Sequence, residues 1–92
     1  MATLTENEIN QKLSELPKWQ RSDQTIVRQF EFKNFPEAIG FVDRLALEAE
    51  EAFHHPDIDI RWNKVQLTLT THDQGGLTVK DFDLAAAIDR LL

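Results

Sequence analysis

The chain has 92 residues, of which 41% are hydrophobic and 28% are charged, and these values indicate one soluble globular domain spanning residues 1–92. Its formal net charge of -6 argues against a nucleic-acid binder, which needs a basic face to neutralise phosphates. The absence of cysteine excludes disulfides, thiolate zinc sites, iron–sulfur clusters and cysteine nucleophiles.

Targeting signals are not visible in the sequence. The segment MATLTENEINQKL has neither the basic start nor the apolar run of a signal peptide. No window approaches the roughly eighteen apolar residues that a membrane span needs. We therefore expect a cytoplasmic protein that interacts with no membrane.

The first elements are a short helix and a hairpin. Thr5 and Glu8 have the spacing of a capping box, so the helix begins after Thr5, and Pro17 closes it. Residues 22–24 read as the turn of a first hairpin. The second strand of this hairpin carries apolar residues of one parity, namely Ile26, Phe30 and Phe32.

The longest helix is predicted to follow Asn34, a good N-cap, with Pro36 tolerated in its first turn. Pro56 should end it at or just before His55. Its apolar residues recur at helical spacing, at Phe35, Ala38, Ile39, Val42, Leu45, Ala46 and Ala49.

A second hairpin follows the proline. The apolar residues have even numbers from 58 to 62 and odd numbers from 65 to 69. This change of parity predicts a two-residue turn at Asn63-Lys64, with Trp62 opposite Val65 on one face.

The last helix begins after a turn at Gly75-Gly76. Thr78 and Asp81 have capping-box spacing, and an apolar stripe follows them. The resulting order is α-β-β-α-β-β-α. This order predicts an α+β fold, most simply a four-stranded antiparallel sheet with three helices on one face.

The histidines are the residues best suited to chemistry. His54 and His55 precede Pro56 at the start of the second hairpin, and His72 lies at its far end. Because the outer ends of hairpin strands meet, all three should gather at one edge of the sheet, with Asp81 nearby. Histidine gives or takes a proton near neutral pH, so the cluster suits a reaction that needs one acid and one base and no cofactor.

Two other interpretations are open. Three histidines and nearby acids could hold a metal ion, but adjacent side chains diverge and no spaced pair such as H-E-x-x-H is present. Alternatively, His54 and His55 could be the polar end of a helix, His72 a solvated strand end and Asp81 a cap residue.

The segment from Glu50 to Asp81 resembles the pterin-4a-carbinolamine dehydratase family. The family motif is an acidic residue, three residues, His-His-Pro, an aromatic residue, a later His and then an Asp. In this sequence these elements are Glu50, His54-His55-Pro56, Trp62, His72 and Asp81. The likeness extends from about Trp19 to the end of the chain.

The resemblance implies an α+β subunit that forms homodimers or homotetramers and an enzyme without metal or cofactor. The implied substrate is the 4a-hydroxytetrahydropterin (4a-carbinolamine) released by aromatic amino acid hydroxylases, which suggests a functional link to phenylalanine hydroxylase. The products are quinonoid dihydropterin and water, so the implied role is a hydro-lyase in tetrahydrobiopterin recycling. Some animal members also bind a homeodomain transcription factor, so the alternative is a non-catalytic pterin-binding, accessory or coactivator module.

The resemblance also implies roles for individual residues. His55 and His72 are expected to act directly as acid and base, while His54 shapes the site or shares the acid role. Asp81 is expected to orient one imidazole and to stabilise its cation. The residues expected to bind the pterin are Glu50, Phe53, Pro56, Trp62, Thr70 and Thr71, with Phe53 and Trp62 as apolar walls. Phe53 departs from the family pattern, in which this position is often polar.

Overall fold

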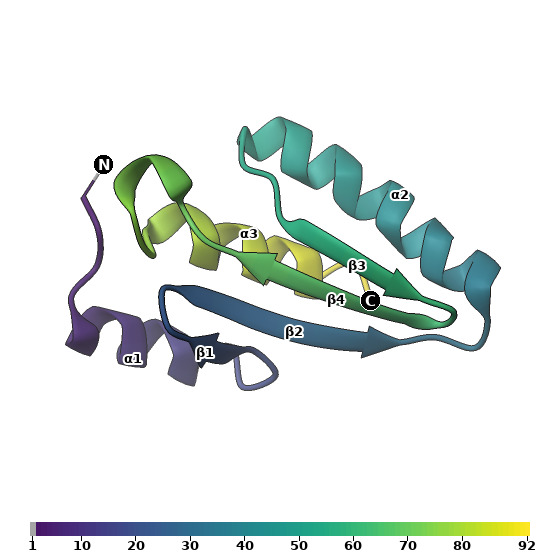
Figure 1. Cartoon of the computed structure of the whole chain (residues 1–92), viewed down its shortest axis with the longest axis horizontal. Coiled ribbons are helices and arrows are strands. Elements are labelled where there is room, and N and C mark those ends of the chain that lie inside the picture. Colours follow the sequence, from purple (N-terminus) through teal and green to yellow (C-terminus); the bar gives the residue numbers. More distant parts are fainter. Residues whose placement is uncertain (1) are drawn as a thin grey trace.

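Four antiparallel strands form one sheet, and the helices cover one of its faces in the computed structural model, which describes residues 2–92 (Figure 1). The strand order is β1-β2-β4-β3. The elements in chain order are α1 (Glu6–Ser14), β1 (Gln20–Ser22), β2 (Thr25–Glu31), α2 (Phe35–Ala52), β3 (Asp57–Arg61), β4 (Lys64–Leu69), the 3-10 turn η1 (His72–Gln74) and α3 (Val79–Asp89). The predicted α+β class and element order are confirmed.

The hydrophobic core lies between the sheet and the helices. Strand residues of alternate position face the helices and are buried, namely Ile26, Phe30, Val65, Leu67 and Leu69. The helices contribute Ile9 from α1, Phe41 and Leu45 from α2, and Phe82 and Ile88 from α3. Because the inner face is apolar and the outer face is polar, the register of the sheet is fixed.

The helix starts follow the predicted capping signals. Thr5 and Glu8 form a reciprocal capping box at α1, and Thr78 and Asp81 form another at α3. The side chain of Asn34 accepts a hydrogen bond from the backbone N–H of Glu37 at the start of α2. All three predicted N-caps are therefore confirmed.

The end of α2 differs from the prediction. The helix ends at Ala52, earlier than a stop imposed by Pro56 would require. Phe53 adopts the left-handed conformation (φ 52°, ψ 39°), and the backbone N–H of His54 bonds back to the carbonyl of Ala49. The His54-His55 pair therefore lies beyond the helix, in the segment that leads into β3, and not in its last turn.

The turn of the second hairpin is also shifted from the predicted position. Arg61 pairs with Lys64 and Ile60 with Val65, so the turn residues are Trp62 and Asn63. The prediction of a turn at Asn63-Lys64 with Trp62 opposite Val65 was wrong because Trp62 adopts φ 54°, which is unusual for a bulky side chain.

Two apolar stripes were assigned only in part. In α2, Phe35 is half-exposed, and Phe41, which the pattern left out, is fully buried. In α3, Leu84, Ala85 and Ile88 are buried as expected, whereas Leu92 is exposed beyond the helix end. Ala38, Leu45 and Ala49 of the predicted α2 stripe are buried, and Phe41 completes the buried face.

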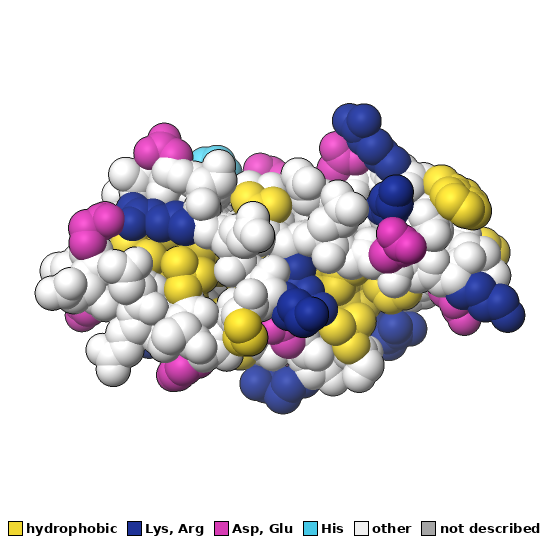
Figure 2. Space-filling view, turned by 90° about the horizontal axis from the view of Figure 1, so that it is seen from below, with side chains coloured by type: hydrophobic (Ala, Val, Ile, Leu, Met, Phe, Trp, Pro, Cys, Tyr) yellow, Lys and Arg dark blue, Asp and Glu magenta, His cyan; other side chains and the backbone are white. Residues whose placement is uncertain are grey.

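The surface is mixed in charge on the side seen in Figure 2. Basic and acidic side chains are interspersed there, and hydrophobic side chains form separate patches between them. Within residues 2–92, no helix has both the length and the apolar composition needed to cross a bilayer.

Candidate active site

The three histidines line one open cavity of about 240 Å³ at the end of the sheet. The segment after α2 supplies two of them, and η1, which follows β4, supplies the third. The residues around the cavity are Phe53, His54, His55, Thr70, Thr71, His72, Asp73 and Lys80. The predicted convergence of the histidines at one edge of the sheet is therefore what the structure shows.

His54 is held by a buried carboxylate. Its Nε2 lies 2.5 Å from Oδ1 of Asp81, and the His54 side chain is 10% exposed while that of Asp81 is fully buried. Because a carboxylate only accepts hydrogen bonds, Nε2 of His54 carries the proton and donates it. The imidazole that Asp81 orients is therefore His54.

The carboxylate of Asp81 is fixed in turn by two groups besides that histidine ring. Its Oδ2 accepts from the Thr71 hydroxyl at 2.8 Å and from the backbone N–H of Thr78 at 2.9 Å. The Thr78 hydroxyl lies 2.8 Å from that of Thr71 and donates to it, since the Thr71 proton is already used. One buried network thus joins the start of α3, the end of β4 and His54.

His55 has a carboxylate partner of its own. Its Nε2 lies 2.5 Å from Oε2 of Glu50, which projects from the last turn of α2. Nε2 therefore donates to Glu50, and Nδ1 of the neutral ring is left as an acceptor. Both groups are exposed, His55 by 61% of its side chain, so the ring is open to a ligand.

His72 is the third imidazole of the cavity, and it is exposed at the start of η1. Its backbone is fixed by the turn, because the N–H of Gly75 bonds to the carbonyls of Thr71 and His72. Gly75 adopts φ 72°, a conformation that glycine enters without strain. The strand itself ends at Leu69, so His72 belongs to this turn and is not the strand end that one interpretation placed there.

The other predicted ligand-binding residues divide into two groups. Phe53, Thr70 and Thr71 line the histidine cavity, although the Thr71 hydroxyl is already bound to Asp81. Trp62 is 70% exposed in the turn at the opposite end of the β3–β4 hairpin, away from the histidines of its own chain. Pro56 precedes β3 and does not line the cavity. Glu50 contacts His55 and is not among the lining residues.

Two lining residues were not predicted, namely Lys80 and Asp73. Lys80 is in the first turn of α3 and makes no salt bridge to residues 2–92. The sequence did contain a signal for Lys80, because it directly precedes Asp81 and so had to lie at the same end of α3 as the predicted site. Asp73 follows His72 in η1.

Among the described residues, no three His, Cys, Asp or Glu side chains converge so as to hold a metal ion. Two carboxylates at the site, those of Asp81 and Glu50, instead each bind one imidazole. Such pairs are the arrangement by which proteins orient a histidine and stabilise its protonated form. The site can therefore give and take protons at a ligand placed against His55 and His72.

Comparison with known proteins places this geometry in a family. Residues 2–91 match the family model described as pterin 4 alpha carbinolamine dehydratase. A protein of Picosynechococcus sp. named "Putative pterin-4-alpha-carbinolamine dehydratase" is 59% identical over 92 residues, covering 99% of this chain and all of that protein.

Two solved structures are also similar. A transcriptional coactivator/pterin dehydratase from Brucella melitensis shares 40% identity with a TM-score of 0.93 over 97% of both chains. A pterin dehydratase-like protein identified as a RuBisCO assembly factor in the alpha-carboxysome shares 27% identity with a TM-score of 0.65, over 79% of this chain and 84% of that one. From the matched length and the shared fold, the chain belongs to the pterin-4a-carbinolamine dehydratase family.

Proposed function

We propose that this protein dehydrates 4a-hydroxytetrahydropterins to quinonoid dihydropterins, in the recycling of tetrahydrobiopterin for aromatic amino acid hydroxylases. The observation that carries the proposal is the meeting of three imidazoles in one cavity, two of them bound to carboxylates. In the reaction the C4a–O bond breaks and the hydroxyl leaves as water after gaining a proton. N5 loses its proton, and the electron pair of that N–H bond forms the C4a=N5 double bond.

His55 is suited to take the N5 proton. Its Nε2–H is bound to Glu50, so Nδ1 is the free acceptor, and the Glu50 carboxylate stabilises the imidazolium that forms. His72, across the same cavity, then donates to the departing hydroxyl, which leaves poorly as hydroxide. Each transfer contributes about 10²–10⁴ in rate, and exchange with solvent resets both rings.

His54 has a different part in this proposal. Its ring is nearly buried, and the network of Asp81, Thr71 and Thr78 holds it in one orientation. It therefore positions the short segment between α2 and β3 that carries His55, and it forms one wall of the cavity. Glu50, expected from the sequence to hold the pterin ring, acts here through His55.

The pterin ring is expected to lie against Phe53, whose side chain is 83% exposed at the cavity. Thr70 lines the cavity beside it, whereas the backbone N–H and C=O of Thr71 are already bonded within the turn that follows. Trp62 lies too far along the hairpin to contact a pterin bound in the cavity of its own chain.

The test compares single variants in an assay in which a hydroxylase generates the 4a-carbinolamine and quinonoid dihydropterin formation is followed. His55→Ala and His72→Ala should each lower turnover at least about tenfold with the fold intact. Gln74→Ala, in the same 3-10 turn but outside the cavity, is the matched control and should have wild-type turnover. Wild-type turnover in both histidine variants would show that the site is wrongly assigned. Treatment with a metal chelator should leave the turnover of the wild type unchanged.

A second candidate is a binding module in which catalysis is incidental. The names of the two similar structures favour it: the Brucella protein is called a transcriptional coactivator/pterin dehydratase, and the carboxysome protein a RuBisCO assembly factor. A phenylalanine hydroxylase gene beside the gene for this chain would support pterin recycling. A protein that binds dihydropterin but does not accelerate dehydration would favour the binding module.

We also propose that the subunit self-associates into a homodimer or homotetramer. β3 is an edge strand of the sheet and leaves one row of backbone N–H and C=O groups unpaired. Large apolar side chains are exposed on or near it and on α2, namely Ile58, Trp62 and Leu47. Light scattering should give a mass of at least twice 10.6 kDa, and a monomer at micromolar concentration would refute the proposal.

A further inference from the structure

His72 differs from the other two histidines in how its ring is held. Nε2 of His54 is bound to Asp81, and Nε2 of His55 is bound to Glu50. Within residues 2–92 the His72 ring makes no hydrogen bond and no ion pair. The place of this ring in the cavity is therefore set by the backbone that carries it.

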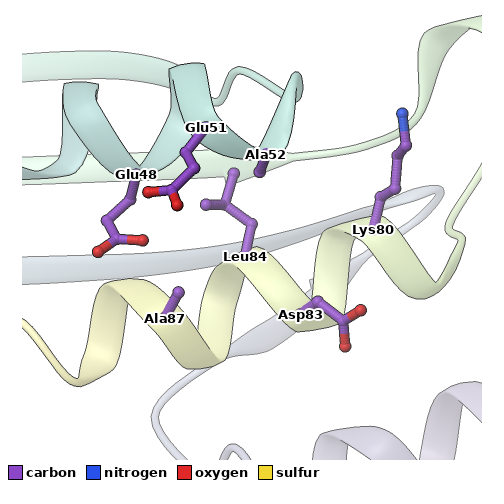
Figure 3. A pocket seen from close by; sticks show the side chains of 7 residues that line it. All are labelled: Glu48, Glu51, Ala52, Lys80, Asp83, Leu84 and Ala87. Atoms are coloured by element: carbon purple, nitrogen blue, oxygen red, sulfur yellow. The ribbon is translucent and has the colours of Figure 1, made fainter.

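The wall that α3 gives to the cavity does not hold the ring. Lys80 is the lining residue from that helix. Figure 3 shows its side chain extending away from α3, at one end of the larger cavity of about 310 Å³ between α2 and α3. Among the described side chains, no hydrogen bond joins the Lys80 amine to His72. The support for His72 therefore comes through its own loop.

The loop of residues 70–76 carries His72 from the end of β4 toward α3. A backbone hydrogen bond of 3.1 Å from the N–H of Thr71 to the carbonyl of Gly76 closes it. The Thr71 hydroxyl ties the loop to Asp81 of α3. These bonds fix the shape of the loop and attach it on one side.

The turn between β1 and β2 makes a second attachment. The register of β2 and β4 pairs Ile26 with Leu69, so the turn reaches past the end of β4. The Thr70 hydroxyl donates to the carbonyl of Gln24 in this turn at 2.7 Å. Gly76 is buried against the same residue, since a Cβ there would lie 3.0 Å from Oε1 of Gln24. Gln24 thus contacts both ends of the loop, and Figure 1 shows the turn and the loop at one end of the sheet.

The turn is itself fixed to α1. Arg21 donates from Nε to the carbonyl of Asp23 at 2.9 Å, and its guanidinium binds Glu6 of α1 at 2.6 and 2.9 Å. The Thr25 hydroxyl donates to the carbonyl of Ser22 across the turn at 2.6 Å. The turn is therefore a fixed point to which the loop is bound.

We propose that the hydrogen bond from Thr70 to Gln24 positions His72 for proton donation, an inference that rests on the proposed function. Thr70 and Gln24 act through the loop and are positioning residues. Without this bond the loop is free to shift at the end next to His72. A proton donor must lie within hydrogen-bond reach of the leaving hydroxyl, so a shift of about 1 Å slows this step. Phe53 and His55 lie on another segment, and their contacts with the ligand stay as they are.

The test compares turnover with ligand affinity in variants of Thr70. Thr70→Val keeps the shape of the side chain and removes the hydroxyl, so kcat for dehydration should fall at least about threefold. The dissociation constant of a stable 7,8-dihydropterin, measured by calorimetry, should stay within about twofold of the wild-type value. Thr70→Ser retains the hydroxyl and should restore kcat to within about twofold of the wild type. Weaker affinity at unchanged kcat would show that Thr70 contacts the ligand directly, and would overturn the inference.

Thr68→Val is the matched control. Thr68 lies two residues earlier on the same face of β4, and its hydroxyl makes no hydrogen bond within residues 2–92. This variant should have the kcat of the wild type. Thr70→Ala removes the hydroxyl without adding bulk, and it replaces Thr70→Val in the test if the valine variant does not fold.

NMR spectra of the histidine rings give a second reading that does not need activity. The chain has three histidines, so the Cε1–H signal of each ring can be followed separately. In Thr70→Val the His72 signal should shift or broaden, while those of His54 and His55 should keep their wild-type positions.

The outcomes distinguish this inference from the proposed function. Unchanged kcat or an unchanged His72 signal in Thr70→Val would overturn the inference and leave the dehydratase proposal standing. A wild type that does not accelerate dehydration would overturn the dehydratase proposal, and the ring signals would still decide whether Thr70 positions His72.

Discussion

Replacing Asp81 tests whether the buried network holds the site together. In Asp81→Ala the Nε2–H of His54 and the backbone N–H of Thr78 lose their acceptor, and neither is open to water. A buried donor left unsatisfied costs about 1–3 kcal/mol, so the variant should lose about 4 kcal/mol of unfolding free energy. In a domain of this size that lowers Tm by roughly 15–30 °C.

Asp81→Asn should cost less, about 1–2 kcal/mol. The amide oxygen can still accept from Thr71 and from the backbone of Thr78, and the amide NH₂ can donate to His54 once that ring carries its proton on Nδ1. Asp83→Ala, an exposed position of the same helix, is the control and should stay within about 0.5 kcal/mol of the wild type.

Urea denaturation followed by tryptophan fluorescence provides the measurement, because Trp19 is buried in the core and reports its loss. A loss of less than about 1 kcal/mol in Asp81→Ala would refute the reasoning, since the network would then carry little of the stability. Equal losses of unfolding free energy in Asp81→Ala and Asp81→Asn would refute it as well.

Three further predictions concern other parts of the chain. A hydrogen bond from Arg21 lowers the pKa of Glu6 below the usual 4.5, and hydrogen bonds from Thr5 in the capping box lower that of Glu8. The stabilisation of α1 by the two carboxylates is therefore fully present above pH 4.5 and is lost as the pH falls through the lowered pKa values. The double variant Glu6→Gln/Glu8→Gln should flatten this part of a plot of Tm against pH. Asp89→Ala removes the acceptor of the half-buried Arg28 guanidinium and should lower the unfolding free energy, measured by urea denaturation, by about 1.5–3 kcal/mol. An unchanged unfolding free energy would contradict a stabilising role of this ion pair. Phe53→Gly relieves a left-handed backbone conformation and should raise the unfolding free energy by up to about 1 kcal/mol. The same variant should bind dihydropterin more weakly in calorimetry, because Phe53 lines the cavity, and unchanged affinity would show that Phe53 does not contact the ligand.

The sequence predicted the parts of the fold that depend on local chemistry. The caps at Thr5, Asn34 and Thr78 are set by side chains within three residues of the helix start, so spacing alone identifies them. The gathering of the histidines follows from hairpin topology, because strands joined by a tight turn must bring their outer ends together.

Features that depend on unusual backbone conformations were not predictable in the same way. Phe53 and Trp62 both adopt positive φ, which spacing and propensity do not anticipate for aromatic residues. The first moves the histidine pair out of the helix, and the second shifts the hairpin turn by one residue. Partners also depend on tertiary geometry: that Glu50 binds His55 and Asp81 binds His54 required the three-dimensional arrangement of α2 and α3.

The central claim is that this chain accelerates dehydration of the 4a-carbinolamine. The direct measurement generates 4a-hydroxytetrahydrobiopterin with a hydroxylase and records quinonoid dihydrobiopterin formation with and without the protein. Catalysis by two positioned imidazoles predicts a rate that rises in proportion to protein concentration, and a loss of at least about tenfold of that increment in His72→Ala. A rate equal to the spontaneous one at every protein concentration would contradict the account.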